Sequence, residues 1–230
     1  MKALKTILTA GAVMFGATAA WAQGSYGFTN TVNQVIPDGS PSGLTLAGTI
    51  SGASGAISDL TVSLNIGNAP GSTAFNGDMY AYLVGPNGGY SVLLNRPGVG
   101  TGNSFGYSDT GFNVTFALSG TQGNIHTYGA GAFSVNGSGQ VTGTWAADGR
   151  TVDPLSTAPS GFDAGGNAGL DSFVNANPNG TWVLFLSDMS GGNTAEVNSW
   201  TLDVTTIPEP SSWAFMAMGA VALFVFRRRR

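Results

Sequence analysis

The stretch that decides the fold runs from Leu60 to Ile66 and reads Leu-Thr-Val-Ser-Leu-Asn-Ile. Every second residue is apolar and the residues between them are polar, which is the period of a β-strand with one buried face. The same alternation returns at residues 112–118 and 200–204. Apolar residues do not recur at helical spacing with caps anywhere between residues 23 and 206. The sequence therefore predicts an all-β fold, a single sandwich of about eight strands.

Two further segments, 78–84 and 181–186, are apolar on both faces and are predicted at the centre of a sheet. The sequence Gly-Pro-Asn-Gly-Gly at 85–89 predicts a hairpin loop to the next strand, 90–94. Stretches rich in Gly and Asn are interpreted as long surface loops of the same domain: residues 98–106, 129–139 and 165–169.

Composition excludes several classes of protein. The chain has 230 residues, no Cys, one His and only 9% charged residues. Disulfides, thiolate metal sites and zinc sites built on several imidazoles are therefore absent. Residues 23–206 contain two cations, Arg96 and Arg150, against eleven acids, a net charge of −9. Such a body repels nucleic acid, so a nucleic-acid partner is not expected.

The first 22 residues are predicted to be a secretory signal peptide. Lys2 and Lys5 precede a mostly apolar stretch, 7–21, that is too short and too interrupted for a membrane span. Ala20 and Ala22 provide the small residues that a signal peptidase reads, so cleavage is expected after Ala22. The remaining domains are then the body, 23–206, and a tail, 207–230.

The tail has three parts: Pro208-Glu209-Pro210, an apolar run at 213–226, and a basic end made of Arg227, Arg228, Arg229 and Arg230. In this order it resembles the PEP-CTERM sorting signal of Gram-negative bacteria. The resemblance implies transient anchoring in the inner membrane, recognition and removal of the tail by an exosortase, and release to the cell surface or an exopolysaccharide matrix. A permanent single-span anchor is the alternative.

The body resembles the P domain (homo B domain) that follows the catalytic domain of kexin-like and furin-like proprotein convertases and of bacterial subtilases. The segments that carry the resemblance come in the same order: 57–66, 77–88, Asn-Pro-Asn-Gly-Thr-Trp-Val-Leu at 177–184, and Asn-Ser-Trp-Thr-Leu at 198–202. The resemblance implies a β jelly roll that stabilises a neighbouring protease, often with calcium. The middle acidic motif of that family is degenerate here, at 108–113. An accessory P domain acting in trans on a secreted subtilisin-like serine protease is therefore the second functional hypothesis.

No motif predicts an enzyme. The sequence Gly-Asn-Ser-Phe-Gly at 102–106 matches the nucleophile elbow of hydrolases around Ser104. A strand follows it where the elbow needs a helix, and a triad with Asp109 and His126 is therefore not expected. Eleven acids offer many carboxylate pairs, but no short motif singles one out. The protein is predicted to be non-catalytic.

Calcium is the cofactor that the composition could support. It binds oxygen ligands, and acidic and amide side chains are abundant while cations are few. Asp78, Asp109 and Asp188, in or beside loops, are the candidate ligands. The alternative is that Asp78 and Asp188 cap turns through local backbone bonds.

Sugar binding is a further hypothesis, since aromatic rings can stack on sugar rings. Tyr80, Tyr82 and Tyr90 are candidates for such stacking. Rings at strand spacing are usually core, which is expected of Trp182 and Trp200. Tyr107, Tyr128 and Trp145 fall in predicted loops and are the favoured ligand-binding residues. The protein is thus predicted to have a structural or adhesive role through exopolysaccharide or surface proteins.

Overall fold

The computed structural model describes residues 23–207 and residue 227. This part of the chain forms ten strands: β1 (Gly24–Val35), β2 (Ser40–Ile50), β3 (Ala56–Asn68), β4 (Met79–Val84), β5 (Tyr90–Asn95), β6 (Phe112–Ala117), β7 (Ser134–Val135), β8 (Val141–Trp145), β9 (Gly180–Asp188) and β10 (Ala195–Ile207). Four short 3-10 turns lie between them: η1 (Asn76–Asp78), η2 (Ile125–Ala130), η3 (Pro159–Phe162) and η4 (Leu170–Phe173). Within these residues no helix is long and apolar enough to cross a membrane.

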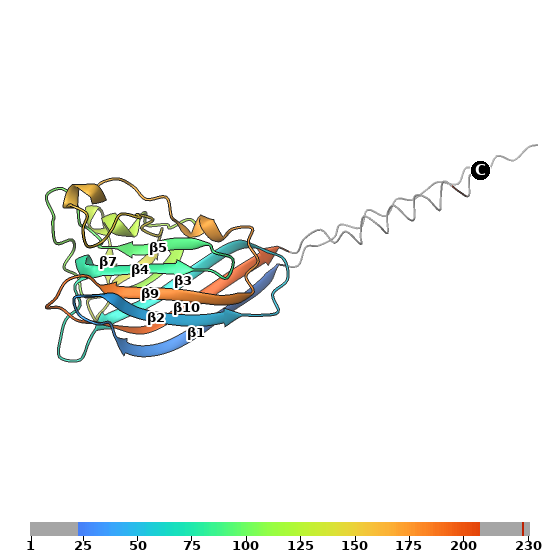
Figure 1. Ribbon diagram of the computed structural model, residues 1–230, viewed down its shortest axis with the longest axis horizontal. Coiled ribbons are helices and arrows are strands. Elements are labelled where there is room, and N and C mark those ends of the chain that lie inside the picture. Colours follow the sequence, from blue (N-terminus) through green and yellow to red (C-terminus); the bar gives the residue numbers. More distant parts are fainter. Residues whose placement is uncertain (1–22, 208–226, 228–230) are drawn as a thin grey trace, which may run out of the picture.

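The strands form two sheets that pack face to face (Figure 1). One has six strands in the order β1-β10-β3-β6-β8-β7, and the other has four in the order β2-β9-β4-β5. All neighbours are antiparallel except β6 and β8, which are parallel. The predicted all-β sandwich is confirmed, with ten strands in place of about eight.

The core follows from the alternation that predicted the fold. In β3, Leu60, Val62, Leu64 and Ile66 point between the sheets and are all buried. Across the pair, β10 places its own apolar residues on the same inner face, so that Trp200 is the partner of Leu64. Burying such a side chain stabilises the fold by about 1.5–3 kcal/mol.

The segments predicted at the centre of a sheet are β4 and β9, and both are inner strands of the four-stranded sheet. The hairpin between β4 and β5 is also as predicted. Its loop closes where the Gly85 amide donates to the Gly89 carbonyl at 2.9 Å. Gly88 has a φ of +80°, a backbone conformation that glycine adopts without a steric penalty.

The two ends of the described domain lie together. Gly24 of β1 is the cross-strand partner of Thr206 of β10, and Figure 1 shows β1 beginning and β10 ending at the same pole of the sandwich. β9 begins near this pole, because the Ile57 amide at the start of β3 donates to the Ala176 carbonyl just before β9. The opposite pole, where β9 and β5 end, is called the loop pole below.

Candidate functional site

Several predicted functional residues lie outside the described part of the chain. These are the cleavage residues Ala20 and Ala22, and the tail residues Pro208, Glu209, Pro210, Arg228, Arg229 and Arg230. Arg227 is described and is exposed. The geometry below therefore concerns the body alone.

Two of the three predicted calcium ligands meet at the loop pole. Asp78 ends η1, and Asp188 ends β9 beside Met79. Asp188 is completely buried, and its Oδ2 atom has no hydrogen-bond partner among the described residues. The guanidinium of Arg96 lies 3.7 Å from Asp78.

Burial changes the protonation of this pair. Desolvation raises the pKa of Asp188 to about 7 and that of Asp78 to about 6. The negative charge of Asp78 adds to the shift at Asp188, whereas the positive charge of Arg96 opposes both shifts. Both carboxyl groups thus lie in surroundings that disfavour their ionisation.

The third predicted ligand has another partner. The carboxylate of Asp109 accepts a hydrogen bond from the Tyr128 hydroxyl at 2.8 Å. Among the described residues, no group of three or more His, Cys, Asp or Glu side chains is arranged to hold a metal ion. The structure therefore does not bring Asp78, Asp109 and Asp188 together as one ligand set, and calcium binding stays a prediction.

Two of the three favoured sugar-binding aromatics are core residues. Trp145 is the last residue of β8 and not a loop residue; it is 2% exposed, and its indole N–H donates to the Thr142 carbonyl. Tyr128, in η2, is 1% exposed. These rings have no free face for a sugar, and the prediction is wrong for both of them. Tyr107 is half-buried and packs on Tyr128 with 4.5 Å between ring centroids.

The candidate aromatics on β4 and β5 lie on the outer face of a sheet, whereas Trp182 and Trp200 are in the core, as expected. In β4 the buried Met79, Ala81 and Leu83 alternate with Tyr80 and Tyr82, which are partly exposed on the outer face of the four-stranded sheet. Phe185 of β9 is the cross-strand partner of Tyr82, and their rings stack at 4.8 Å with 19° between planes. The aromatic face, as it is called below, consists of Tyr80, Tyr82, Tyr90 and Phe185.

Further contacts make the aromatic face one continuous cluster. The rings of Tyr82 and Tyr90 lie 5.3 Å apart, and the hydroxyls of Tyr80 and Tyr90 are hydrogen-bonded at 3.2 Å. Thr45 of β2, small and exposed, lies across from Phe185. β2, β4, β5 and β9 together contain one charged residue, the buried Asp188. The face is therefore aromatic, uncharged and bordered by small side chains.

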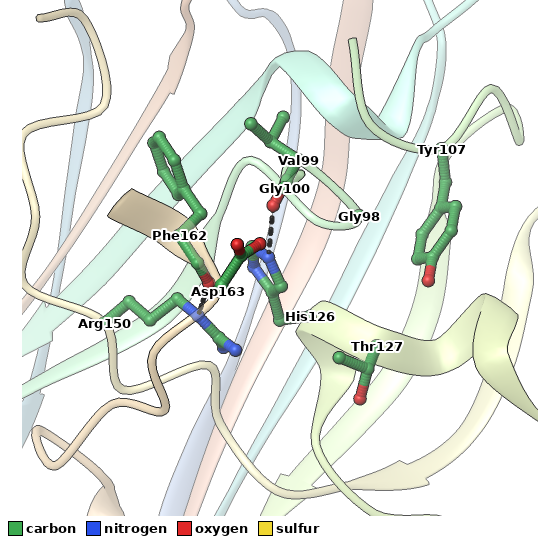
Figure 2. A pocket seen from close by; sticks show the side chains of 9 residues that line it. All are labelled: Gly98, Val99, Gly100, Tyr107, His126, Thr127, Arg150, Phe162 and Asp163. Atoms are coloured by element: carbon green, nitrogen blue, oxygen red, sulfur yellow. Dashed lines mark hydrogen bonds between the residues drawn. The ribbon is translucent and has the colours of Figure 1, made fainter. Parts of the chain in front are cut away.

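A separate cavity of about 210 Å³ lies beyond the end of β5, towards the loop pole. Figure 2 shows the residues around it, which come from loops far apart in the sequence: Gly98, Val99, Gly100, Tyr107, His126, Thr127, Arg150, Phe162 and Asp163. This group includes Tyr107, the one favoured aromatic that is not part of the buried core.

His126 lies beside this cavity and has acceptors at both ring nitrogens. Nδ1 lies 2.8 Å from the Asp148 carboxylate, and Nε2 lies 2.9 Å from the Val99 carbonyl (Figure 2). Both ring nitrogens of His126 are therefore engaged by hydrogen-bond partners. The ring thus has no free nitrogen to act as a base. Ser104 is not among its partners, and Asp109 bonds Tyr128.

Arg150 and Asp163 supply the other charges of the cavity. The guanidinium of Arg150 donates from Nε to the Phe162 carbonyl at 2.7 Å and from Nη1 to Asp148 at 3.0 Å. Asp163 accepts from the hydroxyl and the amide of Thr101 at 2.6 and 2.8 Å, and these bonds lower its pKa. The sequence does not single out either residue for this cavity, because nothing in it places positions 101, 126, 150 and 163 together.

Comparisons with known proteins identify the tail. Residues 206–230 match the model of the PEP-CTERM protein-sorting motif. This motif implies export to the envelope of a Gram-negative bacterium and processing by an exosortase, as the sequence predicts. A comparison with curated protein sequences gave no match.

Solved structures with similarity to the body include a serine protease of Aeromonas sobria. In its complex with a chaperone, the match has 14% identity and a TM-score of 0.43, and it covers 82% of this chain and 28% of the other. The protease without the chaperone gives 13% identity and a TM-score of 0.43, with coverage of 80% and 27%. The chain thus spans just over a quarter of the length of these proteins.

Proposed function

We propose that this exported protein binds polysaccharide outside the cell, without catalysis, and that the aromatic face is its main contact. The observation that carries the proposal is the cluster of four rings on the solvent side of an uncharged sheet. Exposed clusters of large apolar side chains on soluble proteins mark interaction sites. Aromatic rings offer flat apolar faces to the C–H groups of sugar rings, and tyrosine adds a hydroxyl for polar contacts.

The charge pattern favours a glycan over an anionic polymer. Residues 23–206 have a net charge of −9, and no cationic side chain lies on the strands of the aromatic face. Nucleic acid or anionic lipid would be repelled, while an uncharged stretch of polysaccharide would not. The sorting motif implies export to the cell envelope, which supports a partner outside the cell.

The test is retention in the polysaccharide of the producing cell. The full-length chain is expressed there with Tyr82→Thr and Phe185→Thr, because threonine is also favoured in β-strands. We expect the share of protein recovered with the exopolysaccharide, relative to the medium, to fall at least tenfold. Phe105→Ala is the matched control, because Phe105 is 75% exposed but lies on a loop outside the aromatic face.

The outcomes separate the hypotheses. Loss of retention in the double variant, with normal retention in the control, supports the proposal. Absence of wild-type retention contradicts it. Copurification with a secreted subtilisin-like serine protease would then favour the accessory P-domain hypothesis.

A further inference from the structure

The lysines of this chain lie in one short segment. Lys2 and Lys5 are the only two in the sequence, and both precede the predicted cleavage after Ala22. The other basic side chains are those of arginines and one histidine, which contain no primary amine. A chain that begins at residue 23 therefore has a single primary amine, the α-amine of Gln23.

Gln23 lies outside the sheet. It is exposed and directly precedes β1, whose pairing with β10 begins with Gly24 opposite Thr206. The strand ladder thus fixes the backbone from Gly24 onward and leaves the Gln23 side chain in solvent (Figure 1). Exposed side chains change rotamer within nanoseconds, so the carboxamide of this residue can reach the α-amine of the same residue.

Glutamine has the length that lets its carboxamide react with its own α-amine. Attack of the amine nitrogen on Cδ closes a five-membered ring, and two groups held in one residue react far faster than two separate molecules. The attacking amine must be neutral. α-Amines as a class titrate at about 7.7–8.0, so a fraction of them is neutral near pH 7.

We propose that cleavage after Ala22 exposes Gln23 and that this residue then cyclises to pyroglutamate. The bond between the α-nitrogen and Cδ forms, the bond between Cδ and Nε2 breaks, and Nε2 leaves as ammonia with one proton from the amine. No oxidant, reductant or other reactant is consumed. The ring closes within one residue, so the pairing of Gly24 with Thr206 stays intact. The processed protein then has no primary amine.

The loss of this amine has a consequence that rests on the function proposed above. The reducing end of a polysaccharide is an aldehyde in its open form, and primary amines condense with carbonyl groups to Schiff bases. Residues 23–230 contain no lysine, and the lactam nitrogen of pyroglutamate is an amide. The processed protein therefore offers no amine for this reaction, and its contacts with sugar stay reversible.

Mass spectrometry of the processed protein tests the modification. The full-length chain is expressed in the producing cell, and the N-terminal peptide of the secreted product is identified after proteolysis. We expect a peptide that begins at residue 23 and is lighter than the unmodified sequence by one ammonia. Stepwise N-terminal degradation should be blocked. Treatment with a pyroglutamyl aminopeptidase should reopen the chain at Gly24.

Gln23→Ser is the matched variant, because serine has no carboxamide and position 23 takes no part in the sheet. Its α-amine should stay free. A reducing oligosaccharide with cyanoborohydride should therefore add to the variant at one site, and to the wild type at least tenfold less. The melting temperatures of the two proteins should agree, since the ring lies outside the strand ladder.

Two results of the peptide analysis would overturn the proposal. A peptide that begins at residue 23 with a free amine would contradict the cyclisation, and one that begins elsewhere would contradict the cleavage on which it depends. Equal labelling of wild type and Gln23→Ser would also overturn it. Matrix retention is measured separately with the aromatic-face variants. A cyclised protein that is not retained would confirm the modification and contradict the proposed function.

Discussion

Nδ1 of His126 lies 2.8 Å from Oδ2 of Asp148, and neither side chain is more than 3% exposed. This pair joins η2 to the segment after β8, and the Asn95 amide ties the same carboxylate to β5. Three segments that are distant in the sequence therefore meet on one buried charge. We expect the stability of the loop pole to depend on that charge.

Removing this carboxylate should be strongly destabilising. Asp148→Ala leaves His126 and Arg150 buried without their anion, and breaking a buried ion pair costs about 3–5 kcal/mol. Urea unfolding measures the loss. Asp59→Ala is the control, because Asp59 is exposed on β3 and its removal should change stability by less than about 0.5 kcal/mol. Similar losses in the two variants would contradict a central role for the pair.

The buried pair of Asp78 and Asp188 makes stability depend on pH. An acid whose pKa is raised in the folded state, here to about 7 and about 6, binds protons more tightly when folded. Its contribution to stability is therefore favourable at acid pH and is lost as the pH rises from about 4 to about 7. We expect Asp188→Asn to remove this loss.

The size and sign of that effect can be measured by thermal unfolding at two pH values. Asp188→Asn should stabilise the protein at pH 8 by an amount on the order of 1–3 kcal/mol, since one pKa unit is worth about 1.4 kcal/mol. At pH 4 the variant and the wild type should differ little. A stabilisation of the same size at both pH values would show that protonation is not its cause.

The sorting motif predicts the fate of tail variants. Replacing Glu209 and Pro210 with Ala should leave the Arg cluster and the apolar run intact but remove what the exosortase reads. Unprocessed protein should then accumulate in the inner membrane, which cell fractionation and a mass shift on gels would detect. Replacing Ser211 and Ser212 with Ala is a nearby control. Normal release of the Glu209 and Pro210 variant would contradict the role of the motif.

Calcium binding at Asp78 and Asp188 has a requirement that can be tested. Both carboxylates must be ionised, and the ion must compete with Arg96 at 3.7 Å from Asp78. A bound ion at 100 times its dissociation constant would stabilise the fold by about 2.7 kcal/mol. The melting temperature should rise with calcium at pH 8 and less at pH 5, and Asp78→Asn should abolish the rise. A melting temperature that is the same with calcium and with chelator would contradict calcium binding at this site.

The fold could be predicted from local pattern, whereas the binding surfaces could not. Alternation in β3 and the turn at 85–89 are properties of neighbouring residues, and the structure follows them. Tyr80 and Tyr82 are sugar-binding candidates that the sequence does not favour over the loop aromatics, because rings at strand spacing are usually core, yet only one face of β4 is buried. A period-two repeat of tyrosine, which has a polar end, was the signal that could have identified a half-exposed face.

The cavity depends on contacts that no local pattern encodes. His126 and Asp148 are separated by 22 residues, and Arg150 meets Phe162 only because η3 folds back over it. Tyr128 and Trp145 both lie in the long segment that connects β6 to β9. Its Gly-rich stretches predict open loops, but these two aromatic rings are buried and complete the core.

The pairing of Gly24 with Thr206 has a consequence for processing of the chain. Residues 23 and 207 are both at one pole of the sandwich, so the peptide bonds that join the body to the preceding and following segments lie at that pole. The cavity lies beyond the end of β5, at the opposite pole. Cleavage at either end of the body therefore leaves the lining of the cavity unchanged.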